Sequence, residues 1–239
     1  MSMIVLVHGA WLGGWCWRRV APPLRAAGHD VYTPTLTGLG ERAHLGTPET
    51  GLETHILDVV NVLEYEDLDD VVLVGHSYAG LVIAGAADRV PARVAQLVYL
   101  AANLPQPGRS LFESWSAAGR QAVEQEARVA GAGWRWPLPE DLGAAGADLD
   151  PEAVAWLRSK AVGQPLRTFA EPLQLVGPDL DVPRTYIRCT AEGASTPGEV
   201  TGAAWHVREL ATGHWPMLSA PQDLAHLLVA IARGGDQSP

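Results

Sequence analysis

The chain has 239 residues, of which 47% are hydrophobic and 18% charged, and its formal net charge is −10. This length suits one α/β domain, since such domains commonly run to about 200–250 residues, and the composition excludes a disordered chain. No apolar run approaches the roughly 20 residues of a membrane-spanning helix, and the acidic balance disfavours nucleic acid, whose phosphates require clustered Lys and Arg.

Buried strands alternate with amphipathic helices along most of the chain, which is typical of a parallel sheet covered on both faces. The expected strands are 3–7, 31–35, 71–74, 95–100, 185–189 and 206–210. The expected helices are 15–27, 53–65, 78–90 and 221–233. The last helix has a clear start signal, with Ser219 as N-cap and Pro221 in the first turn. We predict an α/β fold with a mostly parallel open sheet and helices on both faces.

The alternation stops between residues 104 and 183, where Pro, Gly and Ala surround short amphipathic pieces at 110–127 and 151–161. About 80 residues without a strand are too many for a connection inside a compact domain. The segment follows the fourth strand, so it lies over the carboxyl edge of the sheet, where ligands bind in open α/β folds. We predict a core formed by 1–103 and 184–239, and a helical cap, or lid, formed by 104–183.

The two cysteines, Cys16 and Cys189, are too few for a disulfide framework and lack the paired spacing of a metal site. We therefore expect free thiols and neither a metal nor a cofactor. The N-terminus enters a strand at once, without the regions of a secretory signal. A soluble, cytoplasmic protein without a membrane partner follows as the expectation.

A nucleophile elbow is indicated at Ser77, which stands where the strand 71–74 turns into a helix. A residue at such a turn has a strained backbone, so the positions two residues away must be small, and they are Gly75 and Ala79. The usual pattern ends in glycine, and here Ala79 is followed by Gly80. A serine that merely caps the helix is the simpler alternative, and the rest of the chain argues against it.

The best base for this serine is His214, in the loop between the last strand and the last helix, because loops at that edge converge on the elbow. The sequence offers less for the other histidines. His76 is expected to point away from the site and to pack or bond locally, because side chains alternate along a strand. We expect solvated side chains on helix faces or surface turns for His29, His44, His55 and His226.

The acid that orients the base is expected between the nucleophile and the histidine in chain order. Glu192, just after the strand 185–189, is our first choice, and Glu199 is the reserve candidate. The two oxyanion-hole amides are expected from the residue after the nucleophile and from the loop after the first strand. Those residues are Tyr78 and Ala10.

Nine tryptophans are many for this length, and several fall in the first loop, the cap and the histidine loop. Core filling explains any single one, but together they favour an aromatic-lined pocket for an apolar or aromatic acyl group. The Gly-rich loop 35–42 lacks a phosphate-cradle spacing and is interpreted as a further pocket wall. The predicted pocket tryptophans are Trp11, Trp115, Trp134, Trp136 and Trp215, with Trp15 nearby.

Taken together, the segments VHGAW, TLTGLGER, GHSYAG, YIRCT and GHWPML resemble the α/β-hydrolase superfamily. The resemblance is closest to the branch of plant methylesterases, hydroxynitrile lyases and small bacterial esterases, and it is weak only in the cap. It implies Ser77 as nucleophile, His214 as base, and Ala10 and Tyr78 as oxyanion donors. The family's acid is an aspartate shortly after YIxCT, where this chain offers Glu192.

The lyases of this branch carry a threonine after the first-strand histidine and a lysine after the catalytic histidine, where this chain has Gly9 and Trp215. A cation is needed to hold departing cyanide, so hydrolysis is favoured. The leading hypothesis is a serine carboxylesterase acting on small-molecule esters of hydrophobic or aromatic acids. The alternatives are a lactonase or cyclase-like tailoring enzyme of secondary metabolism and, less favoured, a non-catalytic binding protein. A homodimer is compatible with an apolar cap surface.

Overall fold

The computed structural model describes residues 1–177, 181–193, 197–198, 200 and 205–234, apart from the side chain of Glu192. Within these residues, the main sheet has six strands in the order β2-β1-β3-β4-β7-β8, and every pair is parallel. The predicted α/β fold is confirmed. The strands are β1 (Met3–Val7), β2 (Asp30–Tyr32), β3 (Val71–His76), β4 (Val94–Leu100), β7 (Arg184–Cys189) and β8 (Trp205–Leu210).

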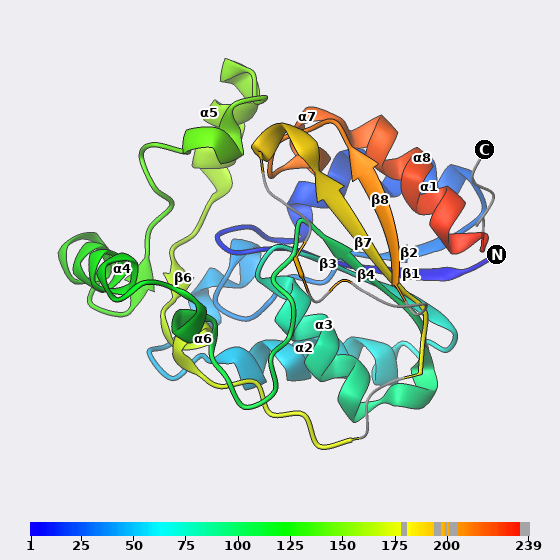
Figure 1. Ribbon diagram of the computed structural model, residues 1–239, viewed down its shortest axis with the longest axis horizontal. Helices are drawn as coiled ribbons and strands as arrows, with labels where there is room; N and C mark the ends of the chain where they lie inside the picture. The colour runs from blue at the N-terminus through cyan, green and yellow to red at the C-terminus, as the bar shows by residue number, and fades with distance from the viewer. Residues whose placement is uncertain (178–180, 194–196, 199, 201–204, 235–239) are drawn as a thin grey trace.

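Helices cover both faces of this sheet, with α1 and α8 on one side and α2 and α3 on the other (Figure 1). The α-helices are α1 (Ala21–Ala26), α2 (Leu52–Tyr65), α3 (Ala79–Arg89), α4 (Ala117–Ala130), α5 (Pro151–Lys160), α6 (Arg167–Ala170), α7 (Pro216–Ser219) and α8 (Pro221–Ala232). The 3₁₀ helices are η1 (Gly14–Arg19), η2 (Gly40–Leu45), η3 (Pro91–Arg93), η4 (Leu111–Ser114), η5 (Gly143–Gly146) and η6 (Thr190–Glu192).

The central strands are apolar throughout because both of their faces are buried. In β1, Val5 and Val7 pack into the core that contains α2 and α3, whereas Ile4 and Leu6 pack into the core with α1 and α8. All four side chains are fully buried. Such unbroken apolar runs are the pattern of a parallel sheet between two helical layers, so the sequence identified the strands well.

One predicted helix and one predicted N-cap residue differ from the structure. The helix expected at 15–27 is divided into η1 and α1, because Pro22 and Pro23 are tolerated only in a first turn, and α1 therefore begins at Ala21. Ser219 is not the N-cap of α8. It ends α7, its hydroxyl donates to the carbonyl of Trp215 (3.4 Å), and Ala220 takes the cap position.

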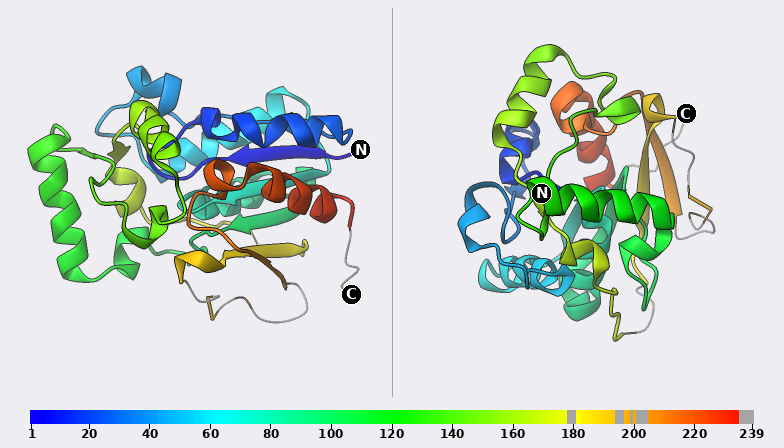
Figure 2. Two further views of the ribbon diagram at one scale, coloured as in Figure 1. Left: turned by 90° about the horizontal axis from the view of Figure 1, so that it is seen from above. Right: turned by 90° about the vertical axis from the view of Figure 1, so that its left-hand side faces the viewer.

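The segment between β4 and β7 lies beyond the carboxyl ends of the strands and carries α4, α5 and α6 (Figures 1 and 2). It also contains two short strands that the sequence did not predict, β5 (Arg135–Trp136) and β6 (Gln164–Pro165), which pair in antiparallel orientation. Two residues are too few to show a period of two, so no pattern could have announced them. The division into core and cap at residues 103/104 and 183/184 stays a prediction.

No helix in the described ranges combines the length and apolarity needed to cross a membrane. The cytoplasmic location and the homodimer remain predictions.

Candidate active site

Ser77 occupies a left-handed backbone conformation, with φ +53°, immediately after β3. Hydrogen bonds on both sides fix this turn. The Ser77 N–H donates to the Leu100 carbonyl (3.0 Å), and the Ser77 carbonyl accepts from the N–H groups of Asn103 (3.0 Å) and Gly80 (3.1 Å). A serine with positive φ is rare outside such constrained sites, so the surrounding bonds must offset its strain.

The glycines around the elbow explain why Ala79 is tolerated. A Cβ at Gly75 would lie 2.7 Å from the carbonyl oxygen of Ala79, and one at Gly80 would lie 2.1 Å from that of Asn103. Ala79 itself is fully buried and accommodates its methyl group. The second close backbone approach therefore falls at Gly80, one residue after the usual position.

His214, the predicted base, lies against this serine. Its Nε2 lies 2.9 Å from the Ser77 Oγ. When Nε2 accepts the serine proton, the ring must carry its other proton on Nδ1. This contact joins the loop after β8 to the elbow after β3, as the order of nucleophile and base along the chain suggested.

The loop that carries His214 is fastened from both the core and the cap segment. The His214 N–H donates to the carbonyl of Ala145 (3.0 Å), and the Gly213 N–H donates to Asp148 Oδ2 (2.7 Å). The His214 carbonyl accepts from His76 Nε2 (2.7 Å). These bonds hold the base at both its amide and its carbonyl.

His76 therefore differs from its prediction in one respect. It is buried, and its hydrogen bond is to the loop of the base and not to a local partner. Burial holds the pKa of His76 well below its ordinary value, and the neighbouring His214 charge acts in the same direction. The neutral ring places its proton on Nε2, since the His214 carbonyl can only accept.

The backbone around Glu192 lies beside the histidine loop. Glu192 ends η6 directly after β7, and the N–H of its neighbour Ala191 donates to the carbonyl of Thr212 (3.0 Å). The side chain of Glu192 and the whole of Glu199 lie outside the described residues. Their assignment as triad acid stays a prediction.

The two predicted oxyanion donors, Ala10 and Tyr78, line one cavity together with Ser77. Tyr78 is the N-cap of α3, so its N–H is one of the helix amides without an intrahelical acceptor. A Cβ at Gly9 would lie 2.6 Å from His76 Nδ1 and 3.0 Å from Ser77 Cβ, so only glycine lets the first loop approach the elbow this closely.

His8 supports the same loop through two hydrogen bonds. The Leu36 N–H donates to His8 Nε2 (3.1 Å), so the ring proton is on Nδ1 and is donated to the Gly9 carbonyl (2.8 Å). Burial lowers the pKa of His8 to about 4, which keeps this tautomer neutral. The loop 35–42 supports the first loop in this way and does not line the cavity, so its interpretation as a pocket wall is wrong.

The cavity has a volume of about 220 Å³ and largely aromatic walls. Trp115, Trp136 and Phe169 contact one another with ring centroids 5.7–5.8 Å apart, and Trp11 packs edge-on against Trp136 at 4.6 Å. The lining residues are Ala10, Trp11, Ser77, Tyr78, Asn103, Leu111, Trp115, Trp136, Pro139, Asp141, Leu142, Ala145, Phe169, His214 and Trp215.

Four of the five predicted pocket tryptophans line this cavity, and Trp134 does not. The Arg135 guanidinium instead lies over the Trp134 ring at 4.1 Å. Alternate residues of a strand point to the same side, so a strand that included both Trp134 and Trp136 would place them together. Trp134 lies in the turn before β5, where this alternation does not apply. Trp15 is also elsewhere, packed edge-on against Trp156.

His55 is the clearest difference among the remaining histidines. It is fully buried and not solvated, with Nε2 donating to the Thr37 carbonyl (2.9 Å) and Nδ1 accepting from the Tyr78 hydroxyl (3.0 Å). Burial lowers the pKa of His55 to about 4. His29 is buried as well, whereas His44 and His226 are exposed as predicted.

Sequence reasoning did not find the cavity residues Phe169, Asp141 and Leu142, which lie in a segment without motifs or long periodic elements. For Asn103 the sequence offers one weak indication of a place at the site, which is its position shortly after the strand predicted at 95–100. Over the described part of the chain, no group of three or more His, Cys, Asp or Glu side chains is arranged to hold a metal ion.

The sequence pattern of the alpha/beta hydrolase family matches residues 4–227. The chain belongs to this family. The hydrolase is 40% identical to a carbendazim hydrolyzing esterase from Nocardioides sp. (strain SG-4G), over 97% of this chain and 100% of that protein. It is 28% identical to methylesterase 9 of Arabidopsis thaliana, over 97% and 98% of the two chains.

Solved structures agree with this placement. An extracellular alpha/beta-hydrolase from a Paenibacillus species has a TM-score of 0.83 and 26% identity, covering 98% of this hydrolase and 100% of that chain. A pyrethroid hydrolase from Sphingobium faniae JZ-2 has a TM-score of 0.72 and 26% identity, covering 97% of each chain. The chain is thus a hydrolase of the esterase branch.

Proposed function

We propose that this hydrolase cleaves carboxylic esters of small hydrophobic or aromatic acids through an acyl-enzyme on Ser77. The observation that carries the proposal is the 2.9 Å contact between Ser77 Oγ and His214 Nε2 on a strained elbow. A serine hydroxyl is a weak nucleophile until a base accepts its proton, and this contact provides the base.

In the first half of the reaction, Ser77 Oγ bonds to the ester carbonyl carbon while its proton passes to His214 Nε2. The carbonyl π electrons move onto oxygen, which the Ala10 and Tyr78 amides stabilise. When the carbonyl re-forms, the C–O bond to the alcohol breaks and the alcohol leaves with the proton from His214. Water then repeats the sequence on the acyl-enzyme and releases the acid.

The cavity supports the choice of acyl group. About 220 Å³ enclosed by Trp11, Trp115, Trp136 and Phe169 suits one ring or a short branched chain, since aromatic walls favour apolar ligands with few polar groups. The similarity to a carbendazim hydrolyzing esterase, a methylesterase and a pyrethroid hydrolase supports ester hydrolysis by this chain.

The deciding experiment compares the parent and Ser77→Ala on p-nitrophenyl and aromatic methyl esters, with mass spectrometry to detect an acyl adduct. We expect turnover and an adduct on Ser77 in the parent, and a loss of at least about 10³-fold in kcat in the variant. Ser219→Ala is the matched control and should retain activity. Unimpaired turnover by a folded Ser77→Ala protein would contradict the proposal.

The same panel should include lactones, because a lactone is an intramolecular ester that this site could open by the same steps. Preferential turnover of lactones would favour the lactonase alternative. A folded parent that neither turns over nor reacts with a fluorophosphonate probe, yet binds small hydrophobes tightly, would favour the binding protein.

A further inference from the structure

The loop that carries the Ala10 amide is held by the cap segment at the next residue, Trp11. Its backbone has φ +63°, a conformation that needs support in a tryptophan. The Trp11 N–H donates to Gln164 Oε1 (3.2 Å), and the Trp11 carbonyl accepts from the Val162 N–H (3.0 Å). The indole Nε1 donates to the carbonyl of Trp136 (3.0 Å). Three polar groups of Trp11 thus bond to residues between β4 and β7.

Gln164 extends this contact inward. Its side chain is fully buried, and its Nε2 donates to Thr168 Oγ1 (2.8 Å), which in turn donates to the Pro165 carbonyl (2.6 Å). Both polar ends of the Gln164 amide are therefore used, one toward the first loop and one toward α6. A buried amide with this many fixed partners has a single orientation.

The second oxyanion donor meets the same group of residues. Thr168, also fully buried, belongs to α6, and its neighbour Phe169 contacts the Tyr78 ring. The phenol donates to His55 Nδ1, and the Tyr78 ring packs edge-on against Phe169 at 5.4 Å. The side chain of Tyr78 is thus fixed by α2 and α6, and the residue lines the cavity.

Hydrogen bonds thus connect Trp11 through Gln164 to Thr168 of α6, and α6 reaches Tyr78 through the ring of Phe169. The path links the two loops that supply the oxyanion amides, although β1 and β3 already hold those loops in one sheet. Sheet pairing fixes the strands only to their ends, at Val7 opposite Gly75, and the amides lie beyond those ends. The contacts through Gln164 and α6 add a connection between the two loops beyond the end of the sheet.

We propose that Gln164 and Thr168 are positioning residues that fix the spacing of the Ala10 and Tyr78 amides. This role rests on the proposed serine mechanism. Donors must already be in place when the oxyanion forms, because reorganisation during the reaction removes most of their benefit. Loss of this connection should therefore weaken transition-state binding and leave substrate binding nearly unchanged.

The first test is Gln164→Met, which keeps the length and volume of the side chain and removes both hydrogen bonds. Gln96→Met is the matched control, since Gln96 Nε2 also donates to a threonine hydroxyl, that of Thr185 (3.1 Å), away from the cavity lining. We expect Gln164→Met to lower kcat by about 10- to 100-fold with KM changed by less than about threefold. The affinity for phenylboronic acid, which forms a tetrahedral adduct with serine, should fall in parallel.

The second test is the pair Thr168→Val and Thr168→Ser. Valine keeps the shape and removes the hydroxyl, so kcat should fall, whereas serine keeps the hydroxyl and should retain kcat within about twofold. If Gln164→Met does not fold, this pair of variants tests the positioning role on its own.

A kcat for Gln164→Met and Thr168→Val equal to that of the parent, or a loss equal to that in Gln96→Met, would overturn the positioning role. A change confined to KM would overturn it as well. A parent without turnover and without fluorophosphonate labelling would overturn the proposed function and this role together, so the two failures are distinguishable.

Discussion

Three non-glycine residues with left-handed backbones lie at the carboxyl ends of adjacent central strands. They are Trp11 after β1, Ser77 after β3 and Ala101 after β4, with φ +63°, +53° and +43°. Each such residue costs on the order of 1–3 kcal/mol, and such strain persists only where neighbouring bonds determine the conformation. Trp11, Ser77 and Ala101 are three of the six non-glycine residues with positive φ in the described part of the chain. Backbone bonds such as Ala101 N–H to the Ile187 carbonyl (2.9 Å) offset the strain at this edge of the sheet.

Gly80→Ala should therefore destabilise the protein and disturb the elbow. A Cβ there would lie 2.1 Å from the Asn103 carbonyl oxygen, whose residue also donates its N–H to the Ser77 carbonyl. We expect a loss of at least about 2 kcal/mol in the free energy of unfolding and a reduced kcat. Urea unfolding measures the first, with Gly119→Ala as control, because that position in α4 meets only the Ser116 hydroxyl, at 3.2 Å. An equal effect of both substitutions would contradict this account of Gly80.

The residues that sequence alone located are those whose role is set by local turn chemistry. Ser77 and Gly75 form a strand-to-helix turn that only a few sequences can adopt, and His214 follows the last strand of the sheet. The burial of His55 and the hydrogen-bond partner of His76 were not predicted, because both depend on groups distant in the chain, Tyr78 and the carbonyl of His214. No local pattern encodes such partners.

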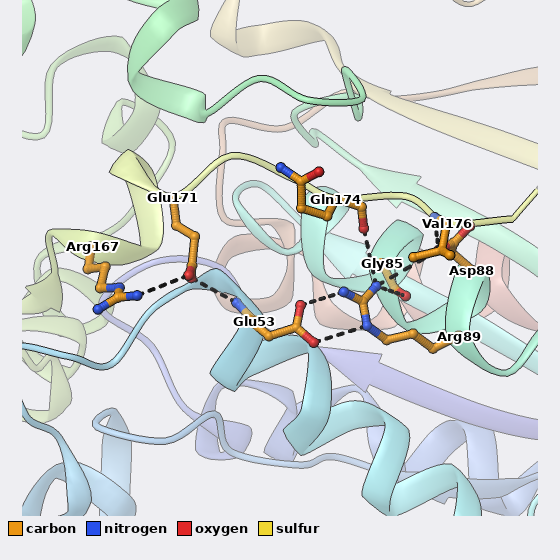
Figure 3. Close-up of polar contacts among 8 residues, drawn as sticks. All are labelled: Glu53, Gly85, Asp88, Arg89, Arg167, Glu171, Gln174 and Val176. Atoms are coloured by element: carbon orange, nitrogen blue, oxygen red, sulfur yellow. Dashed lines mark hydrogen bonds and ion pairs between the residues drawn. The ribbon is translucent and has the colours of Figure 1, made fainter.

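At the scale of elements, the segment between β4 and β7 is fastened to α2 and α3 where it returns toward β7. Glu171 bonds to the backbone of α2 and to Arg167, while Arg89 of α3 pairs with Glu53 and bonds to the Gln174 carbonyl (3.4 Å). The N–H of Val176 donates to Asp88 (2.7 Å). Figure 3 shows these side chains as one continuous set of polar contacts between α2, α3 and the returning chain.

Glu171→Ala should loosen this attachment. Glu171 Oε2 accepts from the Glu53 N–H (3.0 Å) in the first turn of α2, where a carboxylate also interacts favourably with the helix dipole. We expect a loss of about 1 kcal/mol in the free energy of unfolding and faster hydrogen exchange at the start of α2. Glu124→Ala in α4 is the control. Its exposed contact with Arg120 (4.0 Å) should be worth less than about 0.5 kcal/mol.

The order of the main core strands and helices could be predicted because most of them are long enough to show their period; the three-residue β2 was expected at 31–35, and the four-residue α7 was not predicted. Within residues 104–183, the amphipathic pieces expected at 110–127 and 151–161 correspond to η4 with α4 and to α5, whereas β5, β6 and α6 could not be predicted because they have only two to four residues each. Such pieces are stable only through tertiary contacts like the Trp11 carbonyl with the Val162 N–H. The sequence therefore indicated where the segment lies and not how it lines the cavity.

At the scale of the whole molecule, two buried histidines couple the active-site loops to the stability of the fold. His8 supports the first loop and His55 anchors Tyr78, and burial lowers the pKa of each to about 4. An unfolded chain titrates its histidines near pH 6.5, so between about pH 6.5 and about pH 4 the unfolded state binds more protons than the native state. Stability then rises with pH across this window and is lost as the pH falls through it.

His55→Gln should remove one of these contributions. Between about pH 7 and about pH 4.5, we expect each histidine to account for a loss of about 2 kcal/mol in the free energy of unfolding, beyond what the carboxylates contribute. The variant should therefore lose about 2 kcal/mol less than the parent over that interval, as measured by urea unfolding at each pH. His226→Gln, at an exposed position, should leave the interval unchanged. Parallel pH profiles for the parent and His55→Gln would mean that His55 is protonated in the native state as readily as in the unfolded chain, and its buried neutral bond to Tyr78 would then be wrong.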